Sequence, residues 1–141
     1  MSEKGDLVLI IALFGVYGSV IEGRTKIQKM ICILKEKGIQ FSLDFKPYYY
    51  GPYSDQLSDN LNTLIGMNLI NETINPAGYN RYRYDYRLTP EGYKLYNKIE
   101  NKLTSMVDRI RIEVEPLRSM SIPELVREAK RISGITSIHH Y

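Results

Sequence analysis

Residues 81–92 read RYRYDYRLTPEG and decide the fold, because they hold a strand and the start of a helix. Side chains alternate between the two faces of a strand, so the tyrosines and arginines separate. One face is expected to carry Tyr82, Tyr84, Tyr86 and Leu88. The other face is expected to carry Arg81, Arg83, Asp85 and Arg87. Thr89 then suits the N-cap of a helix and Pro90 its first position, so the strand ends there.

A second strand and several helices surround this stretch. Residues 69–75 have a strand pattern and residues 76–80 have turn chemistry, which predicts a hairpin, here called the wing. Helices are expected before the wing at about 6–18, 25–37 and 54–66, with residues 41–52 extended or looped. One long helix from Thr89 to Pro116 and a last helix from Ser121 to Gly134 are expected after it. Thr25 with Gln28, and Ser121 with Glu124, fit the capping-box pattern.

This order of elements predicts a mainly α-helical fold with a small antiparallel β-hairpin, which places the chain in the α+β class. Three short helices followed by a two-stranded wing form the winged helix-turn-helix arrangement, here with added C-terminal helices. The length suits one domain plus an arm. We therefore expect a winged-helix domain at 1–92, followed at 93–141 by a long dimerisation-type helix and a C-terminal helix.

The composition argues against an enzyme. Among 141 residues there is one cysteine, Cys32, and the two histidines are His139 and His140 at the C-terminal end. An internal disulfide, a cysteine-based zinc site and a histidine-containing triad in the domain body are therefore excluded. Phosphate-binding loops, dinucleotide fingerprints and hydrolase motifs are missing from the sequence. We expect no catalytic residues, no cofactor and no metal, and a buried Cys32 rather than a sensor of oxidants.

The one long apolar run covers residues 7–21, LVLIIALFGVYGSVI. Its length falls short of the ~20 residues that a membrane-spanning helix needs. The acidic residues before it make a poor start for a signal peptide. The run predicts a buried helix in a cytoplasmic protein, with a membrane or signal role as the alternative.

Two short motifs resemble known families. Residues 86–92, YRLTPEG, are similar to the Y-x-L-T-x-x-G signature that ends the wing in PadR- and MarR-like regulators. That resemblance implies that Thr89 caps a helix of the kind that often forms the dimer. Residues 26–30, KIQKM, with 49–54, YYGPYS, resemble the K-L-Q-K and Y-G-P pair of the antitoxin-type Panacea domains. This second resemblance implies a small regulator or partner-binding module rather than an enzyme.

Candidate DNA contacts come from three elements, because basic residues gather in 24–50 and 76–89. The helix after the second one enters the major groove in a winged-helix protein, and its amides suit adenine edges. The candidates there are Tyr53, Ser54, Gln56 and Asn60. A row of guanidinium groups in the wing suits phosphates or a narrow minor groove; it consists of Arg81, Arg83 and Arg87. Backbone contacts from the second helix are expected from Arg24, Lys26 and Lys29.

Each of these assignments has a structural alternative. Asp55 and Asp59 repel phosphate, so helix 54–66 could present only a solvated polar face, as could the basic residues of the second helix. The wing arginines could protect an edge strand, with Asp85 pairing its neighbours. The wing tyrosines are expected to pack against helix 54–66 and residues 48–53. Stacking on unpaired bases, or an interface with a protein, is the alternative for them.

Two functions follow from the sequence. The first is a homodimeric transcriptional regulator that binds double-stranded DNA with helix 54–66 and the wing. Its dimer contact is expected along a heptad seam of Tyr96, Ile99, Leu103, Met106 and Ile110, unless these side chains pack onto their own chain. The second is a winged-helix interaction module, an antitoxin or adaptor, that binds a protein partner through its tyrosine-rich surface.

Overall fold

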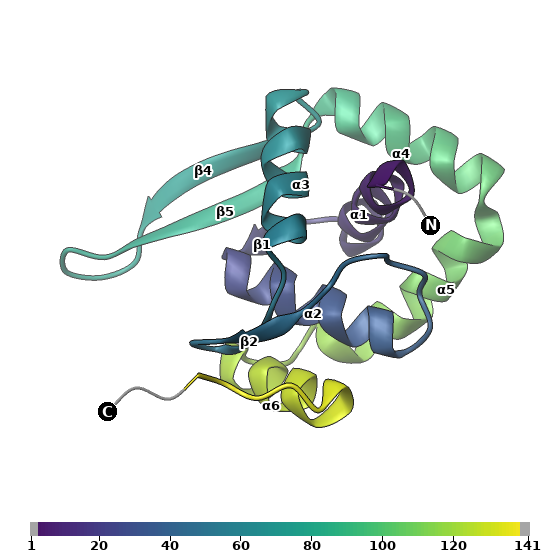
Figure 1. Cartoon of the computed structure of the whole chain (residues 1–141). Coiled ribbons are helices and arrows are strands. Elements are labelled where there is room, and N and C mark those ends of the chain that lie inside the picture. The colour runs from purple at the N-terminus through teal and green to yellow at the C-terminus, as the bar shows by residue number, and fades with distance from the viewer. Residues whose placement is uncertain (1–2, 139–141) are drawn as a thin grey trace.

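The computed structural model of the chain describes residues 3–138, and His139 and His140 lie outside that range. Within it, helices dominate and are accompanied by small antiparallel sheets, which confirms the α+β class (Figure 1). The helices are α1 (Glu3–Tyr17), α2 (Arg24–Glu36), α3 (Asp55–Gly66), α4 (Pro90–Lys102), α5 (Thr104–Val114) and α6 (Ile122–Ser133), with a 3-10 turn, η1, at Glu115–Leu117. The strands are β1 (Ile21–Glu22), β2 (Lys46–Tyr48), β3 (Gly51–Tyr53), β4 (Ile70–Pro76) and β5 (Tyr82–Leu88).

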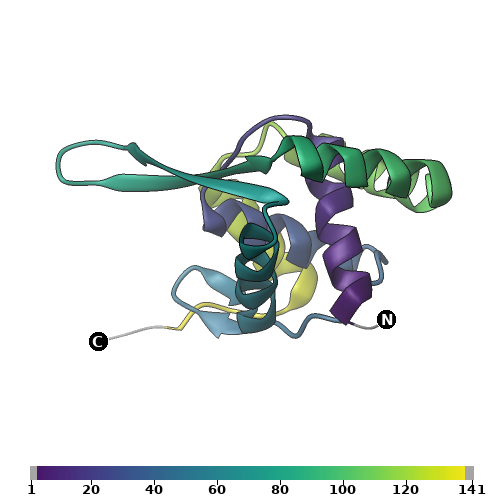
Figure 2. The same ribbon diagram turned by 90° about the horizontal axis from the view of Figure 1, so that it is seen from above.

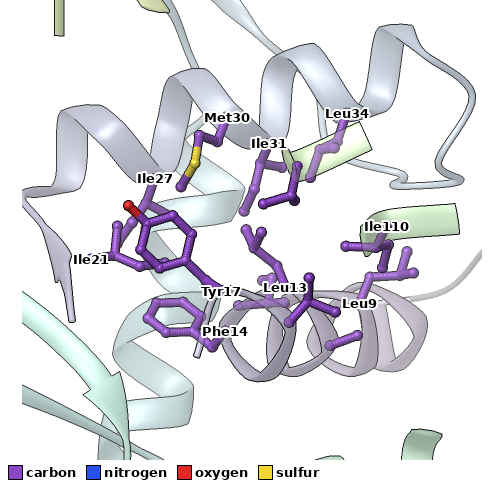
Figure 3. Close-up of a cluster of buried hydrophobic side chains, with 14 of the residues drawn as sticks. Leu9, Leu13, Phe14, Tyr17, Ile21, Ile27, Met30, Ile31, Leu34 and Ile110 are labelled. Carbon is purple, nitrogen blue, oxygen red and sulfur yellow. The ribbon is translucent and has the colours of Figure 1, made fainter. Parts of the chain in front are cut away.

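The apolar run of residues 7–21 forms a buried helix, as predicted. Leu9, Leu13 and Phe14 of α1 are almost completely excluded from solvent. They meet side chains of α2 such as Ile27 and Ile31, and α5 contributes to the same cluster (Figure 3). Since α1 is apolar on nearly every side, it can be stable only when neighbouring elements surround it. In the part of the chain that is described, no helix is long and apolar enough to cross a membrane.

The long helix expected from Thr89 to Pro116 is instead two helices. Leu103 leaves the helical region with φ −125° and ψ 47°, and separates α4 from α5. The Thr104 hydroxyl donates to the Glu100 carbonyl oxygen at 2.8 Å, a side-chain bond that competes with the helix ladder. The bend lets α4 and α5 curve around α1, as Figure 1 shows. Packing against α1, which is distant along the chain, favours this bend. The heptad pattern depends only on local spacing and therefore does not reveal it.

The heptad seam lies largely inside the chain's own core. Tyr96, Ile99 and Ile110 are buried, and the Tyr96 ring lies so close to Gly15 of α1 that a methyl group there would overlap it. Leu103 is exposed and Met106 is half-buried. The alternative of packing onto the same chain therefore describes three of the five seam residues. A homodimer through α4 and α5 stays a prediction, and it would have to use the remaining surface.

The sheet that carries the wing has the strand order β1–β5–β4, and all its pairs are antiparallel. Ile21 pairs with Tyr86 and Ile70 with Leu88, so these four side chains share the face that turns to the core. The short strand β1 was not predicted, because two residues are too few to show an alternating pattern. Residues 46–53 form a second small hairpin, β2–β3, within the segment expected to be extended or looped.

The exit of the wing follows the predicted pattern closely. Thr89 is the N-cap of α4; its hydroxyl accepts from the Gly92 amide at 3.0 Å and donates to the Asn68 carbonyl oxygen at 2.7 Å. Pro90 begins the helix. Gly92 lies directly against the carbonyl oxygen of Leu69, where a Cβ would overlap it. The motif therefore ties the start of α4 to the chain that enters β4.

Candidate nucleic-acid interface

The wing, residues 70–88, projects from the body of the molecule. Both views show the β4–β5 hairpin extending well beyond the helices (Figures 1 and 2). Tyr79 in its turn is 93% exposed. A hairpin that projects in this way can contact a larger partner without any rearrangement of the core.

The root of the wing is anchored by Arg24 at the start of α2. Its guanidinium donates to Tyr86 Oη at 2.7 Å, and also to Ser58 Oγ at 2.9 Å, Asn62 Oδ1 at 2.7 Å and Glu72 Oε2 at 3.3 Å. Tyr86 donates its hydroxyl proton to the same Glu72 oxygen at 2.5 Å. Burial, followed by this bond, raises the pKa of Tyr86 to about 12. Arg24, expected to contact DNA, instead joins α2, α3 and the wing.

The tyrosine face of the wing is only partly packed. Tyr86 is buried as expected, but Tyr84 is 46% exposed and Tyr82 is 69% exposed. Ile74, which pairs with Tyr84 across the hairpin, is 59% exposed. The expectation that Tyr82 and Tyr84 pack against α3 and residues 48–53 is therefore wrong. The hairpin projects beyond the helices, so the side chains of its outer half stay exposed (Figure 2).

The arginine face carries less free charge than its sequence suggests. Arg83 donates to both oxygens of Asp85, at 2.8 and 3.1 Å, and its guanidinium lies 3.5 Å from Glu22 Oε2. The hydrogen bond from Arg83 lowers the pKa of Asp85, which Asn75 also contacts at 2.8 Å. In residues 3–138, the side chains of Arg81 and Arg87 make no ion pair or hydrogen bond. Two of the three predicted guanidinium groups thus remain available to a partner.

The third helix is a poor reader of the major groove. Ser54 is buried as its N-cap and accepts from the Leu57 amide, and Asn60 is only 4% exposed. Gln56 is exposed, but its Oε1 accepts from the Asp44 amide at 2.7 Å. The helix has no lysine or arginine, and Asp59 lies on its exposed side. Asn60 and Ser54 therefore cannot contact DNA in this conformation.

The motif pair of residues 26–30 and 49–54 forms hydrogen bonds that join α2 to the start of α3, and these bonds are here called the clamp. Gln28 Nε2 donates to the Ser54 carbonyl oxygen at 2.9 Å, and Gln28 Oε1 accepts from the Ser54 amide at 2.8 Å. Lys29 Nζ donates to the Pro52 carbonyl oxygen at 2.7 Å. The residues that resemble the Panacea pair thus bind α2 to the start of α3. Lys29 is 2% exposed, so it contacts the neighbouring backbone and not DNA.

The two remaining candidates for DNA contact, Lys26 and Tyr53, each lie against an aromatic ring. The half-buried Lys26 places its ammonium 5.4 Å from the centre of the Tyr17 ring. The half-buried Tyr53 stacks on Tyr48, with ring centres 4.6 Å apart. Tyr49 and Tyr50 beside them are exposed, which gives the β2–β3 hairpin an aromatic surface of its own.

The two buried nucleophilic groups of α2 have structural roles. Burial raises the pKa of Cys32 to about 11, so its thiol stays protonated, which favours the packing interpretation over oxidant sensing. Burial lowers the pKa of Lys29 to about 8. Within the described residues, no group of three His, Cys, Asp or Glu side chains could hold a metal ion.

The lowered pKa of Lys29 predicts a specific pH dependence of stability. Between pH 8 and the ordinary lysine pKa of 10.5, the unfolded chain binds more protons than the folded chain. The free energy of unfolding contributed by Lys29 therefore rises with pH over this range. Denaturant unfolding at several pH values should show wild type gaining stability relative to Lys29→Met as the pH increases. Parallel curves for the two proteins would contradict a buried, destabilising ammonium.

Comparison with known proteins gives two partial relatives. The chain is 32% identical over 83 residues to YwgA of Bacillus subtilis, described as an uncharacterized protein, which covers 59% of this chain and 49% of YwgA. It is 39% identical over 59 residues to a DNA ADP-ribosyl glycohydrolase of Thermus aquaticus, which covers 40% of this chain and 16% of that protein. The chain therefore spans about half of the first relative and a small part of the second. No family model matches it.

Proposed function

We propose that this chain is a DNA-binding module of winged-helix type that contacts double-stranded DNA through the wing rather than through α3. The observation that carries the proposal is a projecting hairpin with two unpaired arginines, Arg81 and Arg87. Guanidinium groups form paired hydrogen bonds with phosphate oxygens and also enter a narrow minor groove. The fixed root of the wing, held by Arg24, keeps these groups in a defined position.

The charges on α3 and on the wing support contact with DNA through the wing. Asp59 on α3 repels phosphate, whereas the wing has a net excess of arginine over its acidic residues. A partial relative that is named as acting on DNA is consistent with a DNA-contacting segment. Use of such a module in transcription regulation is what the wing-exit motif of residues 86–92 suggests.

The test is a fluorescence-anisotropy titration with mixed-sequence duplex DNA at several salt concentrations. Wild type should bind with a strong salt dependence, and Arg81→Ala/Arg87→Ala should bind at least about tenfold more weakly at low salt. Each lost phosphate contact should also reduce the logarithmic salt slope by about 1.

The matched control is Arg127→Ala/Arg131→Ala, which removes two guanidinium groups from α6. It changes the net charge equally and should leave the affinity at ~0.1 M salt within about twofold of wild type, because charges more than about 10 Å from the DNA are then largely screened. Equal losses of affinity in the two variants would mean that the wing arginines add only general positive charge and make no direct contact with DNA. Failure of wild type to bind duplex at low salt would refute the proposal.

A protein-interaction module is the second candidate, and one observation favours it. Ile74, Tyr82 and Tyr84 expose apolar surface, and tyrosine with arginine is the side-chain combination enriched at protein hot spots. Binding of this kind would depend on the tyrosines and change little with salt. The salt titration therefore separates the two candidates.

A further inference from the structure

A groove of about 470 Å³ lies between the exposed tyrosine face of the wing and the start of α2. Its lining includes Tyr82, Arg83 and Tyr84 of β5, together with the bonded pair Arg24 and Glu72, here called its floor. Because the wing projects, the groove is open to solvent along Tyr82 and Tyr84. It is distinct from the phosphate contacts proposed above, which come from guanidinium groups.

The two rings offer free aromatic surface. Tyr82 and Tyr84 lie two residues apart on one strand face, and neither takes part in a ring–ring contact within residues 3–138. Their exposed fractions of 69% and 46% leave room for a flat group to lie against them. Bases stack on aromatic side chains of this kind, and the interaction tolerates any base because each has a π-face.

The floor supplies one hydrogen-bond acceptor of fixed orientation. Glu72 Oε2 accepts from Tyr86 and from Arg24, which holds the carboxylate in place. Its other oxygen, Oε1, accepts no hydrogen bond from the described residues. A carboxylate oxygen accepts readily from an exocyclic amino group, as Glu does from the amino group of cytosine.

The same floor disfavours an anion. Both arginines of the lining are already engaged and have little capacity left for a phosphate. Arg24 donates to four acceptors, and Arg83 pairs with Asp85 and Glu22. A phosphate placed there would also lie beside the Glu72 carboxylate, which repels it. The groove therefore suits a flat, neutral group with an amino donor, and the phosphates of the same ligand would lie outside it.

We infer that this groove holds an unpaired DNA base that carries an exocyclic amino group, stacked on Tyr84 and Tyr82 and donating to Glu72 Oε1. The inference rests on the proposed DNA-binding function and specifies its substrate as duplex DNA with a single-stranded end or an extruded base. In a fully paired duplex the Watson–Crick edges are occupied and the bases are stacked, so no base can enter.

The experiment compares a short blunt duplex with the same duplex carrying an oligo(dC) or an oligo(dT) overhang. Anisotropy titrations should show the oligo(dC) overhang raising wild-type affinity about fivefold or more, and oligo(dT) raising it less because thymine has no amino group. Tyr84→Ala should remove this gain, and Tyr84→Phe should keep it because the ring remains. Tyr50→Ala, which removes an exposed tyrosine outside the groove, is the matched control and should keep it as well.

A second readout reports stacking directly. An overhang containing 2-aminopurine should lose fluorescence on binding to wild type and to Tyr84→Phe, but not on binding to Tyr84→Ala. The affinity of Tyr84→Ala for the blunt duplex should equal that of wild type, which shows that the wing is intact.

The outcomes separate the inference from the proposed function. If the overhang gives no gain, or Tyr84→Ala keeps the gain, the groove does not hold a base and the inference is overturned while duplex binding stands. If oligo(dC) binds in a Tyr84-dependent manner but the blunt duplex does not bind, the inference holds and the duplex-binding proposal fails. If no DNA binds, both are refuted.

Discussion

Replacing Gln28 by alanine is expected to lower the free energy of unfolding by about 2–5 kcal/mol. The Gln28 side chain satisfies both the amide and the carbonyl oxygen of Ser54, and all three groups are buried. Alanine leaves the buried Ser54 amide without a partner, which costs about 1–3 kcal/mol, and the Ser54 carbonyl oxygen keeps only its bond from the Ser58 amide at 3.3 Å. The lost side chain also leaves a cavity between α2 and α3. Urea unfolding followed by circular dichroism measures the change.

Gln56→Ala is the matched control, because it deletes the same side chain from an exposed position. Gln56 accepts one exposed hydrogen bond from Asp44, so its loss should cost less than about 1 kcal/mol. If Gln28→Ala were no more destabilising than Gln56→Ala, the clamp between α2 and α3 would not contribute as described.

Replacing Gly92 by alanine is expected to destabilise the fold by about 2–4 kcal/mol, although alanine is the better helix former. The added methyl group would overlap the carbonyl oxygen of Leu69, which is backbone and cannot rotate away. That oxygen also accepts from the Thr89 amide at 3.1 Å, so moving it weakens the start of α4. Thermal unfolding of the variant should show a correspondingly lower midpoint.

Gly66→Ala provides the comparison at another helical glycine. No atom lies within 4 Å of a Cβ built at Gly66, so alanine should be neutral or stabilise by up to about 1 kcal/mol. If Gly92→Ala behaved in the same way, the close approach of α4 to the chain before β4 would be incorrect.

The sequence predicted the elements whose signals are local. Thr89 and Ser54 are N-caps as expected, and Ser121 forms a full capping box with Glu124. The alternation of residues 82–88 placed Tyr86 and Leu88 on the core face correctly. These predictions succeed because a cap or a strand face depends on residues only a few positions apart.

Predictions failed where a distant partner decided the outcome. The capping box expected for Thr25 and Gln28 does not form; α2 begins after Gly23 without a side-chain cap, because Gln28 binds Ser54 instead. The break at Leu103 depends on packing around α1 in the same way. Neither partner could be identified from spacing along the chain.

The candidate site shows the same limit. Spacing grouped Arg81, Arg83 and Arg87 as equivalent, but Asp85 and Glu22 pair with Arg83 alone. The sequence also could not show that Arg24 forms its hydrogen bonds within the fold, because its acceptors lie far along the chain, on α3, β4 and β5. The bonds of Glu72 to Arg24 and Tyr86 could not be predicted either, because a single acidic residue in a strand gives no signal by itself.

The most direct test of the central claim is an amide chemical-shift perturbation experiment on the isotope-labelled chain titrated with duplex DNA. Contact through the wing predicts that the largest shifts fall on residues 76–88, with residues 55–63 of α3 little changed. Shifts concentrated in α3, or spread over α6 and not the wing, would contradict it.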